Sequence, residues 1–223
     1  MKAIIIAASL ICIGLISGAV YFATRPVKAG PRTVPISAQY TARVSAGGWD
    51  MGATAPKVKI VEYADFQCPA CDAAAPIIKE AMAQTSDIAQ LEYRPYPLQQ
   101  HDKAQLAAIG AEAAGRQGKF WEMHDKLFDN QSTWVNDSTF TFRDRLVGYA
   151  KDLGLDTNQF NADLDDSTTL DQINKSVDAG NAINLQATPT IQVNGTTLDN
   201  DTTTAIIQQG VPYLVNYIKT HQQ

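Results

Sequence analysis

Two cysteines separated by two residues mark the point where an apolar run changes into an alanine-rich run, in the stretch EYADFQCPACDAAAP (62–76). The preceding residues, KVKIVEYADF (57–66), are β-branched and aromatic and predict a strand. From Pro69 to about residue 85 the chain is alanine-rich and predicts a helix, and proline suits the first helical position because its missing N–H costs nothing there. Cys68 and Cys71 therefore lie where a strand gives way to a helix. They could form a structural disulfide, half of a zinc site or a redox couple.

The remaining chain supplies the other elements of an α/β domain. IAQLEYRPYPL (88–98) predicts a second strand, ended by two prolines. Residues 102–186 have apolar side chains at helical spacing and no convincing strand. TPTIQVNGTTL (188–198) predicts a strand with a tight hairpin at Asn194-Gly195, and one last helix follows over residues 202–220. The order strand, helix, strand, helical insert, hairpin, helix indicates a sheet covered by helices, with an insert at about 102–186.

The N-terminal part has a different character. Residues 3–23 form an uncharged apolar run of 21 residues, close to the roughly 20 that a helix needs to cross a membrane. Because Ser17-x-Ala19 is a weak cleavage site, residues 1–24 are predicted to be an uncleaved anchor rather than a cleaved signal. Residues 25–56 are rich in Pro, Gly, Ala and Ser and predict a linker, with a short ordered piece near Trp49, whose ring would dock on the domain surface. The folded domain is predicted to span 57–221.

Charge gives two indications about location and partners. Three basic residues, Arg25, Lys28 and Arg32, follow the apolar run, which by itself would place the body of the protein in the cytoplasm. The short N-terminal tail before that run is instead the arrangement of an export signal, so we expect an extracytoplasmic body, secreted if the signal is cleaved. The net charge is −5, which makes nucleic acid a poor candidate as a partner.

The alternatives for the cysteine pair differ in what else they require. A structural zinc site needs four ligands, but there is no second C-x-x-C, and His101, His124 and His221 fall on separate predicted elements. A disulfide that closes only two intervening residues would stabilise the fold little. A redox couple fits the position, because the free N–H groups at a helix start stabilise the thiolate of Cys68. Cys71, one turn later, would then be the resolving thiol. No metal or cofactor is predicted.

Several positions together resemble the DsbA-type thiol–disulfide oxidoreductases of the thioredoxin superfamily. Besides DFQCPACDAAAP, these are Glu62, six residues before Cys68, Pro76 within the helix, the segment GKFWEMHDKLF (118–128) in the insert, and Thr188-Pro189 before a strand. The resemblance covers about residues 57–220. It implies a thioredoxin fold split by a helical insert, with Thr188-Pro189 as a cis-proline beside the cysteines. The site residues that it implies are Cys68, Cys71, Glu62, Pro189, Thr188 and Pro69.

The resemblance also implies a function. The protein would introduce disulfide bonds into reduced exported polypeptides, with Glu62 handling protons at Cys71 and with Thr188 and Pro189 presenting backbone groups to an extended peptide. A quinone-linked membrane protein of the DsbB type would reoxidise it. Ala70 stands where strong oxidants of this kind have histidine, so a reductase or isomerase is an alternative. A non-catalytic, membrane-anchored peptide-binding chaperone is a second alternative.

Other polar and aromatic residues near these motifs are given structural roles. Trp121, Met123 and His124 are predicted to pack within the insert. Asp65 and His101 are predicted to be surface groups or caps at the ends of elements.

Overall fold

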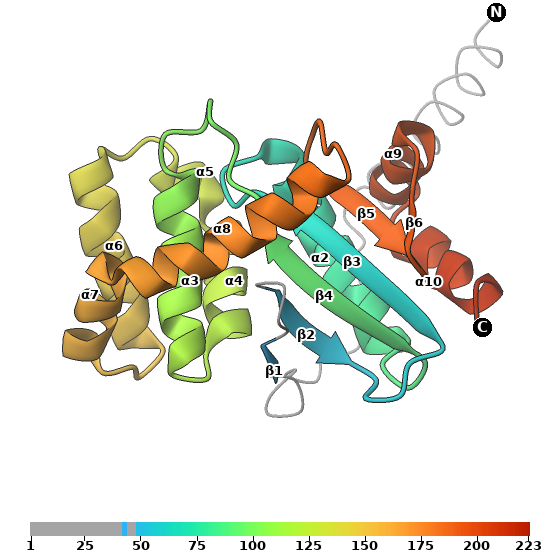
Figure 1. Cartoon of the computed structure of the whole chain (residues 1–223), viewed down its shortest axis with the longest axis horizontal. Coiled ribbons are helices and arrows are strands. Elements are labelled where there is room, and N and C mark those ends of the chain that lie inside the picture. Colours follow the sequence, from blue (N-terminus) through green and yellow to red (C-terminus); the bar gives the residue numbers. More distant parts are fainter. Residues whose placement is uncertain (1–41, 44–47) are drawn as a thin grey trace, which may run out of the picture. The chain divides into compact units, whose positions relative to one another are not determined.

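A computed structural model describes residues 42–43 and 48–223 (Figure 1). The predicted anchor at 1–24 and most of the predicted linker lie outside these residues. Within the ranges described, none of the helices combines the length and the apolar character needed to cross a membrane.

The centre of the domain is a mixed sheet with the strand order β1-β2-β4-β3-β5-β6. The pair β3–β4 is parallel, and every other pair among the described strands is antiparallel. Helix α2 makes the connection between the two parallel strands. The bounds are β1 (Ala42–Arg43), β2 (Trp49–Gly52), β3 (Val58–Ala64), α2 (Pro69–Gln84), β4 (Ala89–Pro95), β5 (Thr190–Val193) and β6 (Thr196–Thr197).

One face of the sheet is the core face that α2 covers. Side chains alternate along β3 so that Ile60 and Glu62 share a face with their register partners Leu91 and Tyr93 on β4. All four are buried. Helix α2 places a complementary row of small and apolar residues in this core, including Cys71, Ala74, Ile78 and Met82. A carboxyl group and a tyrosine hydroxyl are therefore enclosed in an otherwise apolar layer below the start of α2.

Strand β2 corrects the predicted linker boundary at residue 56. It pairs with β4 along its whole length, so residues 49–52 belong to the sheet. Trp49 is 5% exposed rather than docked on the surface. Its ring stacks on Phe120 at 4.8 Å between centroids, and its Nε1 donates to Glu112 at 2.9 Å. Gly115 leaves room for the ring, because a Cβ there would lie 2.3 Å from a Trp49 ring carbon.

The chain between β4 and β5 forms the predicted helical block, which lies beside the sheet with α8 crossing toward β5 (Figure 1). Gly118, at φ 77°, separates α3 from α4. The Asp156 side chain caps α7 by accepting from the N–H groups of Asn158 and Gln159. The helices are α3 (Ala104–Arg116), α4 (Phe120–Asp129), α5 (Gln131–Trp134), α6 (Thr139–Asp152), α7 (Thr157–Asp165) and α8 (Ser167–Ala182).

The C-terminal part confirms the hairpin and corrects the last helix. Asn194 and Gly195 both have positive φ, 51° and 81°, in the turn between β5 and β6. The predicted single helix at 202–220 is two helices, α9 (Asn200–Gln209) and α10 (Val211–Thr220). Gly210 breaks the helix at φ 72°, and Pro212 fits the first turn of α10, where its missing N–H needs no partner.

Candidate active site

The cysteine pair lies at the start of α2, as the sequence predicted. Cys68 is the residue before the helix, with extended backbone angles, and Pro69 occupies the first helical position. Both thiols are free. Cys68 is 8% exposed, whereas Cys71, one turn into the helix, is fully buried. Only the first sulfur is therefore near enough to the surface to meet a large substrate.

The surroundings drive the pKa values of the two thiols in opposite directions. The pKa of Cys68 is lowered to about 5, chiefly because the Cys71 thiol hydrogen bonds to its sulfur. Burial opposes this, while the backbone N–H groups of Ala70 and Cys71 lower the pKa further. Burial raises the pKa of Cys71 well above its ordinary value. The dithiol form thus holds a thiolate at Cys68 and a protonated thiol at Cys71 near neutral pH.

The loop before β5 completes the surroundings of Cys68. When it is protonated, the Cys68 thiol donates to the backbone carbonyl of Thr188 at 3.4 Å, across 120 residues of sequence. The peptide bond between Thr188 and Pro189 is cis, as the family resemblance implied. Thr188 is buried and Pro189 is partly exposed. The fold therefore brings the predicted proline loop to the reactive sulfur.

Glu62 lies in β3 on the core face and is 2% exposed. Burial raises its pKa to about 8, so the carboxyl group is mostly protonated at neutral pH. Its neighbour on β4, Tyr93, is fully buried, and the Tyr93 hydroxyl makes no hydrogen bond within the described part of the chain. The pKa of Tyr93 is raised first by burial and then by the charges of Glu62 and Cys71. The Glu62 carboxyl group, the Tyr93 hydroxyl and the Cys71 sulfur thus share one enclosed region below Cys68.

Asp65 and His101 were expected to be surface groups or caps at the ends of elements; His101 is partly exposed, but Asp65 lies inside the domain. The Asp65 side chain is fully buried, and its Oδ2 lies 2.6 Å from His101 Nδ1. Its carboxylate also accepts from the Gln67 N–H at 2.7 Å and from the Leu98 N–H at 2.9 Å. Asp65 does cap the loop before α2, but from inside the domain.

Two glutamines connect this loop to the helical insert, and the sequence analysis named neither. Gln131, in α5, donates its amide to the carbonyls of Phe66 at 2.8 Å and Cys68 at 3.0 Å. Gln67 donates to the Asp102 carboxylate at 2.9 Å and accepts from the Lys103 N–H at 2.7 Å. Only the position of Gln67 beside Cys68 could have drawn attention in the sequence, because helical spacing does not distinguish Gln131 from other polar residues.

Comparison with known proteins agrees with this geometry. The sequence model of a family described as thioredoxin matches residues 45–211. The chain belongs to this thioredoxin family. The matched range includes β2, which agrees with its place in the sheet.

Solved structures of the thioredoxin fold support the same assignment. BdbD from Bacillus subtilis, in its oxidised form, superposes with a TM-score of 0.62 and 23% identity, covering 82% of this chain and 96% of that one. MdbA from Corynebacterium diphtheriae, a thiol-disulfide oxidoreductase, gives a TM-score of 0.64 and 17% identity, covering 78% and 94%. At these identities the likeness establishes the fold, which confirms the predicted thioredoxin fold with a helical insert.

The curated relatives that match are longer proteins, and the match covers only part of each. The Na(+)/H(+) antiporter NhaA 1 of Salinispora arenicola is 40% identical over 139 residues, which are 62% of this chain and 20% of the antiporter. NhaA 1 of Mycolicibacterium vanbaalenii is 40% identical over 141 residues, or 61% and 21%. The chain thus spans about a fifth of the length of the curated relatives that it matches.

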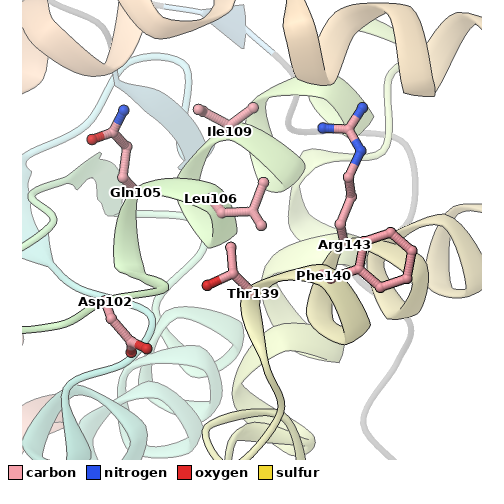
Figure 2. Close-up of a pocket in the computed structure, with 7 residues that line it drawn as sticks. All are labelled: Asp102, Gln105, Leu106, Ile109, Thr139, Phe140 and Arg143. Carbon is pink, nitrogen blue, oxygen red and sulfur yellow. The ribbon is translucent and has the colours of Figure 1, made fainter.

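A pocket of about 380 Å³ opens between α3 and α6 of this thioredoxin-family domain. Figure 2 shows Leu106 and Ile109 of α3 in the middle of the pocket, with Phe140 and Arg143 of α6 at one side. Phe140 is 76% exposed. At the other side lies Asp102, the residue that accepts from Gln67. The pocket is therefore connected to the loop that carries Cys68 through the Gln67–Asp102 hydrogen bond.

The structure brings the six predicted site residues together around the start of α2 or in the core beneath it. The predicted packing role of His124 is also confirmed, because its ring lies among Phe66, Tyr93, Trp121 and Phe128. In the residues described, His, Cys, Asp and Glu form no cluster of three that could hold a metal ion.

Proposed function

We propose that this protein is a thiol–disulfide oxidoreductase that introduces disulfide bonds into exported polypeptides. The observation that carries the proposal is the contrast between the two sulfurs. Cys68 lies near the surface and has a pKa lowered to about 5, whereas Cys71 is fully buried. A stable Cys68 thiolate favours the dithiol over the disulfide, and an easily reduced disulfide is what an oxidant needs.

The exchange proceeds through a mixed disulfide. A substrate thiolate attacks the sulfur of Cys68, the Cys68–Cys71 bond breaks, and Cys71 leaves with the electron pair. A second substrate thiolate then attacks the substrate sulfur of the mixed disulfide and releases Cys68 as a thiolate. The substrate loses two electrons and two protons, and the protein retains the electrons as a dithiol.

Glu62 supplies the proton that Cys71 needs on leaving. The departing Cys71 sulfur is buried, and its raised pKa makes it a strong base. Glu62 remains protonated to about pH 8 and lies on the same enclosed face of the sheet. A proton transfer from Glu62 to Cys71 would leave a carboxylate, which is reprotonated from solvent before the next cycle.

Thr188 and Pro189 present the substrate to Cys68. The Thr188 carbonyl lies 3.4 Å from the Cys68 sulfur, so an extended peptide that pairs with backbone groups of this loop would bring its own sulfur to the same place. Pro69 contributes by starting α2 immediately after Cys68.

The setting of the reaction follows from the family resemblance and the N-terminal sequence. Residues 1–24 would anchor the protein in the membrane with its catalytic domain outside the cytoplasm, where reduced polypeptides emerge. A DsbB-like membrane protein would reoxidise the dithiol. Ion transport is not part of the proposal, because the match to the antiporters covers only about a fifth of their length.

The deciding experiment is a redox equilibration with glutathione buffers, in which alkylation and mass measurement report the state of Cys68 and Cys71. We expect a potential in the range of secretory oxidants, about −120 to −180 mV, rather than about −270 mV as in thioredoxin. A potential near that of thioredoxin would support the reductase alternative, to which Ala70 points. Function retained by a Cys68→Ser, Cys71→Ser double variant would support the non-catalytic chaperone.

A further inference from the structure

Asp65 is bonded to both cysteines through its backbone. Its N–H lies 3.5 Å from the Cys71 sulfur, and its carbonyl accepts from the Cys68 N–H at 3.0 Å. Any shift of Asp65 would therefore change the position of one sulfur or the other. A change in the charge of its side chain would be felt at the same place.

The Asp65 carboxylate is itself held by two other segments. Its Oδ1 accepts from the N–H of Gln67, in the cysteine loop, and its Oδ2 accepts from the N–H of Leu98, in the loop after β4. His101, also after β4, lies 2.6 Å from Oδ2 through Nδ1. An ionised carboxylate can only accept hydrogen bonds, so Nδ1 carries the proton in this contact. A buried carboxylate with three donors is well satisfied, and the backbone of the same residue contacts both cysteines.

We propose that Asp65 and His101 form a positioning pair that sets the thiol–disulfide equilibrium of Cys68 and Cys71. The Asp65 charge opposes the Cys68 thiolate, because two negative charges repel each other strongly where water is excluded. The His101 N–H offsets part of the Asp65 charge and so protects the thiolate. The inference rests on the proposed disulfide exchange, and it names two residues that act on the cysteines without touching the substrate.

The two members of the pair have opposite effects, and this separates a tuning role from a structural one. Asp65→Asn removes the charge with little change in shape. The Cys68 thiolate then becomes more stable, and so does the dithiol form relative to the disulfide. His101→Ala leaves the Asp65 charge less compensated, so the Cys68 thiolate and the dithiol form become less stable. His101→Asn keeps a donor near the position of Nδ1 and should behave like the unmodified protein. If the pair only held the loop in place, Asp65→Asn and His101→Ala would shift the equilibrium in the same direction.

The test measures the redox equilibrium constant of the full chain with glutathione, together with the thiolate absorbance of Cys68 as a function of pH. We expect Asp65→Asn to shift the constant about tenfold toward the dithiol and His101→Ala about tenfold toward the disulfide. A tenfold shift corresponds to a change of about one unit in the pKa of the Cys68 thiol. His221→Ala, in the exposed C-terminal segment, is the matched control and should shift neither quantity.

Each outcome decides the question. If the unmodified protein does not exchange with glutathione, the proposed function fails. If it exchanges but the Asp65→Asn and His101→Ala shifts have the same sign, or are both absent, the positioning pair alone is refuted. Should Asp65→Asn fail to fold, as judged by circular dichroism, the partly exposed His101 decides: a shift in His101→Ala that His101→Asn lacks supports the pair, and equal behaviour of those two variants overturns it.

Discussion

Replacing Glu62 with glutamine should make the protein more stable and less active. The Glu62 pKa is raised to about 8 by burial, from an ordinary value of 4.5. Between these values the folded protein keeps a proton that the unfolded chain has lost. Because the native state then binds more protons, its stability falls as the pH rises from about 4.5 to about 8. Glutamine has no proton to lose, so Glu62→Gln removes this pH-dependent cost.

The size of the gain follows from the same pKa values. Each pH unit in this window corresponds to about 1.4 kcal/mol, so the gain is about 3 kcal/mol at pH 7 and about 5 kcal/mol above pH 8. Below pH 4.5 the variant and the unmodified protein should be equally stable. Cys68 also titrates in this range, in the opposite direction, but it contributes equally to both proteins and cancels in the difference.

The assay is urea unfolding of the reduced protein at several pH values from 4 to 9, with a disulfide-exchange assay on the same samples. Glu80→Gln is the matched control, because Glu80 is partly exposed on the outer part of α2 and should change stability by less than about 0.5 kcal/mol. A Glu62→Gln protein that gains nothing at pH 7, or gains the same amount at every pH, would refute the assignment of a buried, protonated Glu62. Unchanged exchange kinetics would refute its role as proton donor to Cys71.

Three further perturbations test other parts of the site and the core. Cys71→Ala should raise the pKa of Cys68 above 5, whereas Cys71→Ser keeps a hydroxyl donor and should raise that pKa less. The thiolate absorbance measures the Cys68 pKa in both variants, and equal values would contradict the proposed hydrogen bond. Gln131→Ala leaves two buried carbonyls of the active-site loop without the amide donor and should cost about 1–3 kcal/mol in urea unfolding. Gly115→Ala should lower stability by about 1–3 kcal/mol through collision with the tryptophan ring behind it, whereas Gly148→Ala, with open space around its α6 position, should be neutral or stabilising.

The sequence was informative where local patterns determine local structure. The Asn194-Gly195 dipeptide predicted its hairpin because both residues tolerate positive φ, and the strand before Cys68 was clear from its β-branched residues. The position of Cys68 at the start of α2 was also a local inference, from the strand on one side and Pro69 on the other. The cis-proline needed the family resemblance, because sequence alone gives the cis form a low probability.

The features that the sequence did not predict depend on distant partners. Strand β2 is only four residues long and lies in the sheet because β4 pairs with it and Phe120 stacks on Trp49. Asp65 becomes buried because Leu98 and His101 return to it from the loop after β4. Nothing in the neighbourhood of a single aspartate indicates whether donors will arrive from more than 30 residues away.

The same dependence on distant partners bears on the direction of the proposed reaction. From the sequence, Ala70 argued for a weak oxidant, because it lacks the imidazole that could stabilise a thiolate. In the structure, the Cys68 sulfur is stabilised first by the Cys71 thiol and also by the backbone N–H groups at the start of α2, which Ala70 provides as well as histidine would. Gln131 also binds the Cys68 carbonyl from the insert. The identity of residue 70 is therefore one contribution among several, and the backbone geometry supports an oxidant without a histidine at this position.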